Sequence, residues 1–156
     1  MKEKMVIGID IGGSKIRAVL WNGKRVIKAR ELKTPKNLTA FRKLLGKLIG
    51  NNSTTRIGIA VPGRVNGSVF VSATNLPYIR NFNLAKLFPS VKRKLDHDAR
   101  CFARAECGKK RCLAITLGTG VGRAFAKNGR VLKIKKFEYP ERWEKDYQKI
   151  RGSKNN

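Results

Sequence analysis

Residue types that bind phosphate stand together near the start of the chain. Asp10 lies inside an apolar run and is followed by Gly12, Gly13, Ser14 and Lys15. Glycines let backbone N–H groups approach an anion, and a serine hydroxyl and a lysine amine can donate hydrogen bonds to it. The Asp10 carboxylate could hold a water bound to a metal ion. Taken alone, the segment is more typical of an ordinary hairpin turn with a solvated lysine, because short motifs have many chance matches.

A second glycine loop comes late in the chain. Gly118, Thr119, Gly120 and Gly122 follow an apolar strand, so strand, glycine turn and strand occur twice. The first loop lacks the spacing of a Walker loop, and strand character resumes where a Rossmann fingerprint would open a helix. The repetition points to paired phosphate contacts of another kind.

Between the two glycine loops, ligand-binding positions occur at strand ends. Pro62 and Gly63 stop a buried strand, at the kind of strand end where open α/β sheets bind ligands. His97 and Asp98 lie beyond another strand, at the start of a helix. Helix capping is enough to explain an Asp at that position.

Hydrophobic periodicity predicts the elements that position these residues. Apolar residues at helical spacing predict an amphipathic helix over 38–49, and Asn22-Gly23 suits a type I′ turn between two strands. The predicted strands cover 5–11, 15–21, 25–32, 56–61, 91–95, 113–117, 123–127 and 130–135, with a hairpin over 64–71 about Asn66-Gly67. The other predicted helices cover 84–88, 99–108 and a polar stretch from 140 to 150.

Length and cysteine content limit the class of protein. A chain of 156 residues with 41% apolar residues can form about one domain with a real core. No apolar run approaches the ~18 residues of a membrane helix, and Met1-Lys2-Glu3-Lys4 is unlike a signal peptide, so no membrane partner is expected. Three cysteines without a CxxC pair suggest unpaired thiols in a reducing cytoplasm. No zinc site is expected, since Cys107, Cys112 and His97 lack a standard ligand spacing.

The net charge is +26, from 36 Lys and Arg against 10 Asp and Glu. Such a charge favours binding of nucleic acid by counterion release. It is also compatible with a general basic bias of the proteome, or with a missing acidic partner segment. The basic residues are spread along the whole chain and few aromatics lie among them, which is unlike a dedicated nucleic-acid site.

The order of these motifs resembles the N-terminal half of the ROK family of sugar kinases, repressors and open reading frames, in the actin/hexokinase/Hsp70 superfamily. The resemblance covers about residues 5–133. Gly8–Lys15 is similar to the family's first phosphate motif, and Leu117–Gly122 is similar to its second. Ile57–Gly63 resembles the family's Pro-Gly loop, and Asn75–Pro77 resembles its Asn-Leu-Pro segment. Asp98–Gly108 resembles the stretch with Asp-Ala and Glu-x-Gly.

The resemblance implies an ATP- and Mg²⁺-dependent kinase acting on a hexose or related sugar. Asp98 would be the general base that takes the proton of the sugar hydroxyl. Pro62, Gly63, Asn75 and His97 would border the sugar. The two glycine loops would bind the nucleotide phosphates, with Lys15 adding charge and Asp10 orienting the water shell of the metal.

The resemblance also implies an α/β fold of the ribonuclease H-like, actin-type ATPase kind. We expect a mixed sheet with flanking helices over 1–108, the first strands of an incomplete second lobe over 109–135, and a polar helical tail over 136–156. The family's Gly-His sugar segment, zinc-ligand cysteines and adenosine region do not occur in the sequence. We therefore expect an exposed apolar strand face, weak catalysis by this chain alone, and a homo-oligomer or a complementing C-terminal lobe as partner.

Two further residues depart from the family pattern. His97 stands where the family usually has Asn, and Arg123 replaces a small residue after the second glycine loop. Arg123 would either clash with the nucleotide or bind its phosphate. The alternative to a kinase is a non-catalytic, basic binding or regulatory protein with salt-dependent, non-specific nucleic-acid binding. We expect no helix-turn-helix like that of the family's repressors, because the first phosphate motif begins at Gly8.

Overall fold

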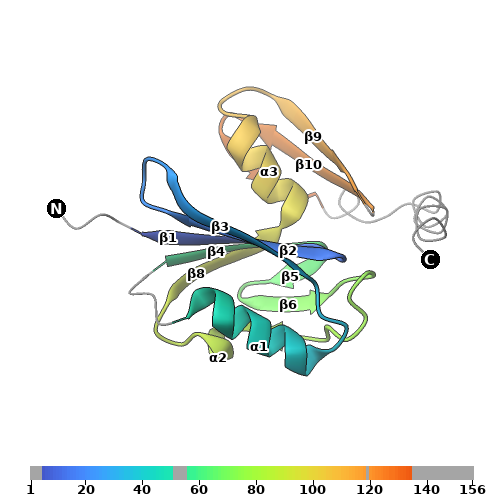
Figure 1. Cartoon of the computed structure of the whole chain (residues 1–156). Coiled ribbons are helices and arrows are strands. Elements are labelled where there is room, and N and C mark those ends of the chain that lie inside the picture. Colours follow the sequence, from blue (N-terminus) through green and yellow to red (C-terminus); the bar gives the residue numbers. More distant parts are fainter. Residues whose placement is uncertain (1–4, 51–55, 119, 135–156) are drawn as a thin grey trace. The chain divides into compact units, whose positions relative to one another are not determined.

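The computed structural model describes residues 5–50, 56–118 and 120–134 (Figure 1). Thr119 and the helix predicted over 140–150 lie outside the described residues. The chain forms two compact units, Met1–His97 and Asp98–Asn156. The expected lobe boundary lay near residue 108, whereas this division follows His97 and groups the third helix with the later strands. None of the helices within the described ranges has the length and apolar character of a membrane span.

The first unit is built on a five-stranded mixed sheet in the order β3-β2-β1-β4-β8. Strand β1 pairs antiparallel with β2 and parallel with β4, which pairs parallel with β8. The mixed sheet of the predicted fold is thereby confirmed. The strands are β1 (Val6–Ile11), β2 (Lys15–Trp21), β3 (Val26–Lys33), β4 (Arg56–Val61) and β8 (Lys92–His97).

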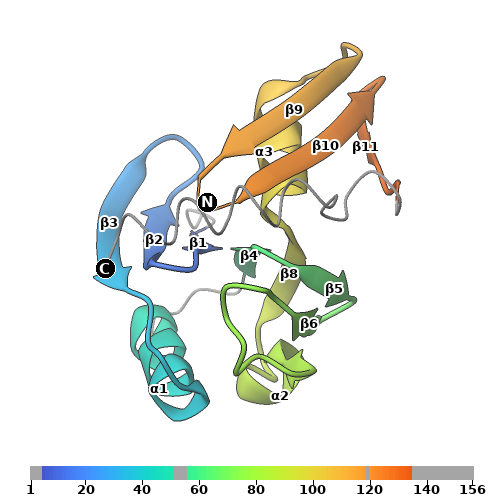
Figure 2. The same ribbon diagram turned by 90° about the vertical axis from the view of Figure 1, so that its right-hand side faces the viewer.

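Helix α1 (Leu38–Ile49) has the predicted bounds and packs on one side of this sheet (Figure 1 and Figure 2). The Asn37 side chain caps it by accepting a hydrogen bond from the Ala40 amide. Its buried face includes Phe41 and Leu45, which pack in one core with alternate residues of β1, among them Ile7 and Ile9. The apolar face of β1, formed by every second residue, therefore packs against the apolar face of α1, formed by residues at helical spacing.

A small three-stranded sheet, in the order β5-β6-β7, completes the first unit. Its strands are β5 (Arg64–Asn66), β6 (Val69–Ser72) and the two-residue β7 (Phe82–Asn83), which precedes helix α2 (Leu84–Leu87). The predicted hairpin about Asn66-Gly67 is confirmed, because Asn66 pairs with Val69. Strand β7 is too short to carry a periodicity and was not predicted.

The predicted type I′ turn at Asn22-Gly23 is wrong. A type I′ turn needs positive φ at both central residues, and Gly23 has φ +99° whereas Asn22 is not among the residues with positive φ. The loop spans the gap between Trp21 and Val26, and the Asn22 side chain accepts hydrogen bonds from the Lys24 and Arg25 amides. An Asx turn has replaced the two-residue turn.

The second unit packs helix α3 (Asp98–Glu106) on a three-stranded antiparallel sheet in the order β11-β10-β9. The strands are β9 (Cys112–Leu117), β10 (Val121–Lys127) and β11 (Arg130–Leu132). The predicted turn at Asn128-Gly129 joins β10 to β11, with positive φ at both residues. The core is mostly alanine, including Ala99, Ala114 and Ala124, so the helix lies close to the sheet.

The opposite face of β9 is exposed, as predicted. Leu113, Ile115 and Leu117 alternate with the buried face of the strand, and Leu117 is 76% exposed. This is a larger exposed apolar surface than single scattered residues produce.

Two cysteines of the second unit form a disulfide, so the expectation of three unpaired thiols is wrong. Cys107 and Cys112 have Cα atoms 5.5 Å apart and are joined across the turn between α3 and β9. Gly108 turns the chain at this point with φ +52°. The five-residue separation brings the end of the helix beside the start of the strand, which sequence spacing alone did not indicate.

Candidate functional site

The first glycine loop joins β1 to β2 in a tight turn. The Gly12 amide donates a hydrogen bond of 2.8 Å to the Lys15 carbonyl, and Ile11 pairs with Ile16 across the strands. A Cβ atom at Gly12 would lie 2.8 Å from that carbonyl oxygen, so the turn requires glycine there. Among the described residues, neither the Gly13 nor the Ser14 amide donates to a protein acceptor. These amides suit an anion.

Thr34 holds the carbonyl side of the same loop. Its hydroxyl donates to the Gly12 carbonyl at 2.8 Å, and its amide donates to the Ser14 carbonyl at 2.9 Å. The Gly12 and Ser14 carbonyls therefore both accept hydrogen bonds from Thr34, the residue directly after β3. The sequence analysis missed this role of Thr34.

The loop lysine is paired with an acidic residue. Lys15 Nζ lies 2.5 Å from Glu31 Oε1, and Arg17 Nε lies 2.7 Å from Glu31 Oε2. The hydrogen bonds from Lys15 and Arg17 lower the pKa of Glu31, and the hydrogen bond to Glu31 raises the pKa of Arg17. Glu31 was also missed, although cross-strand pairing of β2 with β3 could have indicated it.

Asn75 packs directly against the glycine loop. A Cβ atom at Gly13 would lie 2.9 Å from the Asn75 Cβ, which leaves room for glycine alone. Leu76 is 1% exposed and anchors the segment in the core. The Leu76 amide donates to the Ala73 carbonyl, and the Ile79 amide to the Leu76 carbonyl. These turns place the side-chain amide of Asn75 beside Gly13 of the first glycine loop.

The Pro-Gly loop lies against the same segment. Gly63 is the second residue after β4, which ends at Val61. A Cβ atom at Gly63 would collide with the Ser72 carbonyl oxygen and lie 2.9 Å from Ala73. The stretch from Ser72 to Asn75 thus contacts the Pro62-Gly63 loop at one end and Gly13 at the other. Three motifs that are far apart in the sequence are brought together within the first unit.

The parallel strands end at a common edge of the sheet. β1 leads into Gly12, β4 into Pro62, and β8 ends at His97, which pairs in register with Val61. The half-buried His97 is therefore a neighbour of the Pro-Gly loop, and its amide donates to the Asp96 side chain at 2.9 Å. Asp10 is the next-to-last residue of β1 and is exposed. Most of the predicted residues of the first unit share this edge.

Asp98 begins α3 in the second unit. Its Oδ1 accepts a hydrogen bond of 2.6 Å from the amide of the next residue, Ala99. An N-cap side chain bonds the amide two or three residues further on, so this is not the usual capping contact. The same oxygen lies 3.6 Å from the position that a Cβ atom would take at Gly122. The carboxylate is half-buried and sits beside a strand residue without a side chain.

The second glycine loop is shorter than predicted. Gly118 and Gly120 belong to the turn, closed by a 2.9 Å hydrogen bond from the Gly118 amide to the Gly120 carbonyl, and Thr119 lies outside the described residues. Gly122 is part of β10 and pairs with Thr116. A Cβ atom at Gly122 would collide with the Thr116 side chain of β9 and lie 3.1 Å from the Ala99 Cβ, so the neighbouring strand and the helix both leave room only for glycine.

Arg123 follows Gly122 in β10, with Ile115 as its cross-strand partner. Side chains alternate between the two faces of a strand. Arg123 thus lies on the face of β10 that points away from α3, together with the exposed residues of β9.

Comparison with known proteins gives one family for most of the chain. The model of the ROK family matches residues 6–134. The chain is 29% identical over 145 residues to an N-acetylgalactosamine kinase of Shewanella sp. (strain ANA-3), covering 81% of this chain and 46% of that protein. It is 34% identical over 145 residues to an N-acetyl-D-glucosamine kinase of Erwinia tasmaniensis, covering 81% and 47%. The chain thus spans about half the length of these relatives.

Solved structures show the same fold. A ROK family protein from Streptococcus pneumoniae, in complex with sucrose, has a TM-score of 0.72 at 26% identity and is covered to 48%, against 84% of this chain. A ROK family glucokinase from Streptomyces griseus, in complex with glucose and AMPPNP, has a TM-score of 0.74 at 22% identity, covering 84% of this chain and 47% of that one. These neighbours confirm the predicted actin-like ATPase fold over part of its length.

Proposed function

The chain belongs to the ROK family, and from this premise we propose that it provides the sugar- and phosphate-binding half of an ATP-dependent sugar kinase. One observation carries the proposal. Within the first unit, residues 72–75 lie against Gly63 of the Pro-Gly loop at one end and against Gly13 of the glycine loop at the other. Both loops follow parallel strands at their carboxyl ends. Binding a sugar beside a phosphate requires this combination of amide donors, a polar side chain and close backbone approach.

The proposed roles follow from these positions. The Gly13 and Ser14 amides bind nucleotide phosphate, and Asn75 and His97 donate to or accept from sugar hydroxyls. Asp98 takes the proton of the attacking hydroxyl, because it follows His97 and has one carboxylate oxygen on the Ala99 amide. Asp10 holds the water shell of Mg²⁺. When bound, ATP supplies the phosphoryl group, and the metal neutralises charge that develops on the phosphates.

The substrate class is proposed from the relatives. Their names specify N-acetylhexosamines and glucose, so the acceptor is a hexose or an N-acetylhexosamine. We place the reaction in the cytoplasm, where ATP is available. Turnover by these 156 residues alone is expected to be slow, because excluding water from a kinase site requires closure of two complete lobes.

A partner is part of the proposal. The exposed apolar face of β9, with Leu113, Ile115 and Leu117, is expected to be covered by a complementing lobe or a second copy of the chain. Light scattering after size-exclusion chromatography tests self-association directly. A monomer that remains well dispersed at high concentration would contradict self-association and leave a separate polypeptide as the partner.

Sugar binding tests the proposal through Asn75. Calorimetric titration with glucose, N-acetylglucosamine and N-acetylgalactosamine is expected to identify one preferred sugar. Asn75→Ala is expected to weaken its binding about tenfold, since a sugar hydroxyl loses its partner. Asn66→Ala, at the tip of the β5–β6 hairpin, serves as the matched control and is expected to bind normally. Absence of sugar binding by folded protein, or equal losses in both variants, would contradict the proposal.

The net charge favours a second candidate function. A chain of charge +26 is expected to bind nucleic acid without sequence preference. In that case the logarithm of the affinity falls linearly with the logarithm of the salt concentration. Fluorescence anisotropy with two unrelated DNA duplexes at several salt concentrations checks this. Salt-insensitive binding to one duplex alone would contradict non-specific binding.

A further inference from the structure

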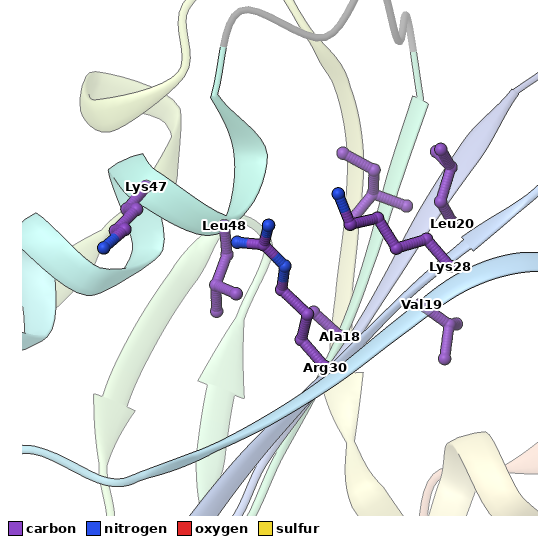
Figure 3. Close-up of a pocket in the computed structure, with 8 residues that line it drawn as sticks. Ala18, Val19, Leu20, Lys28, Arg30, Lys47 and Leu48 are labelled. Atoms are coloured by element: carbon purple, nitrogen blue, oxygen red, sulfur yellow. The ribbon is translucent and has the colours of Figure 1, made fainter.

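A group of cations lines a cavity of the first unit at the end of the sheet away from the glycine loop (Figure 3). The cavity of about 180 Å³ lies between the β2–β3 hairpin and the last turns of α1. Ile7 near the start of β1 lines it, whereas the glycine loop follows the end of that strand. Its lining is Ile7, Ala18, Val19, Leu20, Lys28, Arg30, Lys47 and Leu48.

The strand register turns two of these cations toward the helix. Lys28 pairs with Leu20, and Arg30 pairs with Ala18. Ala18 is buried in the core beneath α1, so the side chains of Lys28 and Arg30 start from the same face of the sheet. Figure 3 shows both extending from β3 toward α1, where Leu48 and Lys47 lie. The floor is apolar, because Ile7, Ala18 and Leu48 are all less than a tenth exposed.

None of the described residues that line this cavity is acidic. The acidic residue of β3, Glu31, occupies the opposite face and pairs with Lys15 and Arg17. Among the residues that the structure describes, no ion pair involves Lys28, Arg30 or Lys47. Like charges above low-dielectric walls repel one another and concentrate a positive potential in the hollow.

We propose that this cavity binds the phosphate group of a small phosphate-bearing molecule. The planar guanidinium of Arg30 can donate two parallel hydrogen bonds to phosphate oxygens, and Lys28 contributes a point charge beside it. The apolar floor accommodates a short organic portion. The cavity is smaller than the ~300–1,000 Å³ typical of drug-sized ligands, so the ligand is free phosphate or a small phosphate monoester.

A structural role competes with this assignment. Charged residues that point inward from an edge strand discourage pairing with a second sheet, and β3 is an edge strand. That role requires charge on the strand but no bound anion. It predicts aggregation when the charges are removed, whereas the phosphate site predicts loss of one saturable binding event.

The test is a titration of the full chain at low ionic strength with inorganic phosphate and with phenyl phosphate. Affinities are measured by calorimetry, and the site is located from amide ¹H–¹⁵N shifts. The variant is Lys28→Gln/Arg30→Gln. The matched control is Lys33→Gln/Lys36→Gln, which removes equal charge, because Lys33 lies on the other face of β3 opposite Lys15 and Lys36 is exposed in the loop before α1.

Shifts are expected at Arg30, Lys47 and Leu48, and the Lys28→Gln/Arg30→Gln variant is expected to bind about tenfold more weakly, from the loss of charged hydrogen bonds. The control variant is expected to retain wild-type affinity. Tighter binding of phenyl phosphate identifies an ester as the ligand, and equal affinities identify the free anion. Equal losses in both variants, shifts confined to Gly12–Ser14, or unchanged affinity with aggregation of the Lys28→Gln/Arg30→Gln variant would overturn the proposal.

Discussion

A Cβ atom at Gly13 would lie 2.9 Å from the Asn75 Cβ, closer than real Cβ atoms approach one another. Gly13→Ala is therefore expected to push Asn75 away from the loop. Overpacking of this kind costs about 1–3 kcal/mol of unfolding free energy. Urea unfolding measures that loss, and sugar affinity measured on the same protein is expected to fall with it.

Gly46→Ala is the matched control, because nothing lies within 4 Å of a Cβ atom at that position in α1. Alanine in a helix interior is more stable than glycine by about 0.5–1 kcal/mol, so this variant is expected to be more stable than wild type. If Gly13→Ala were as stable as Gly46→Ala, the close contact with Asn75 would be disproved.

Tyr78 follows the Asn75-Leu76-Pro77 segment, and its phenol makes the unfolding free energy depend on pH in the alkaline range. Its hydroxyl donates to the Pro35 carbonyl at 2.6 Å, and burial raises the pKa of Tyr78. Because the pKa of Tyr78 is higher in the folded chain than in the unfolded chain, the protonated phenol stabilises the fold below the unfolded pKa of about 10. This stabilisation is lost as the pH rises through the folded pKa. Its ring packs edge-on against Phe41 at 5.9 Å.

Tyr78→Phe keeps the ring and removes the hydroxyl. Unfolding free energy at pH 8 is expected to fall by about 1 kcal/mol through loss of the hydrogen bond. Between pH 9 and pH 11, about where tyrosine titrates, the variant is expected to lose less stability than wild type. Parallel pH slopes for the two proteins would refute the role assigned to the buried phenol.

At the scale of elements, the disulfide between α3 and β9 is the feature with the clearest energetic consequence. A bond that closes so short a loop is expected to stabilise the second unit by about 2 kcal/mol, mainly by restricting the unfolded chain. Cys112→Ser is expected to lose that amount, and Cys101→Ser, which leaves the bond intact, is the control.

Thiol titration of the air-oxidised, denatured protein checks the bond itself. The sequence has three cysteines, and the structure pairs Cys107 with Cys112, so one reactive thiol per chain is expected. A count of three would show that the sulfurs are not bonded. A count of one would argue against a reducing cytoplasm as the location of the chain, because disulfides are rare there.

Periodicity predicted the elements better than their connections. The core strands and α1 could be predicted because one face of each is continuously apolar, and burial of that face decides both type and position. The turn after Trp21 could not, because the Asn22 side chain bonds to backbone amides and competes with the type I′ geometry. The disulfide depends on where a helix ends in space, which no local pattern specifies.

At the scale of the molecule, the candidate site was predicted in its parts but not in its contacts. Gly12, Gly13, Pro62, Gly63 and Asn75 were recognised from motif order, and the structure brings them together in the first unit. Thr34 and Glu31 were missed, because only the pairing of β2 with β3 brings them beside their partners, which are the glycine loop for Thr34 and β2 for Glu31. Gly122 lies in β10 close to Thr116 and Ala99, and its contact with a nucleotide phosphate stays a prediction.

The match to the family extends over residues 6–134, and the chain spans about half the length of its relatives. For the whole molecule, the open point is thus whether a chain of about half this length supports phosphoryl transfer. We propose Asp98 as the general base of that transfer, because it is the carboxylate that begins a helix directly after strand β8.

Sugar-dependent release of ADP, measured with the preferred sugar and with wild-type, Asp98→Asn and Asp96→Asn proteins, tests this claim most directly. Asp96→Asn removes the same charge from the adjoining strand and keeps an oxygen for the His97 amide. Loss of a general base lowers rates by about 10²–10⁴-fold. That loss is expected for Asp98→Asn, and near wild-type rates are expected for Asp96→Asn. Undiminished activity of Asp98→Asn, or no sugar-dependent ADP from folded wild-type protein, would contradict it.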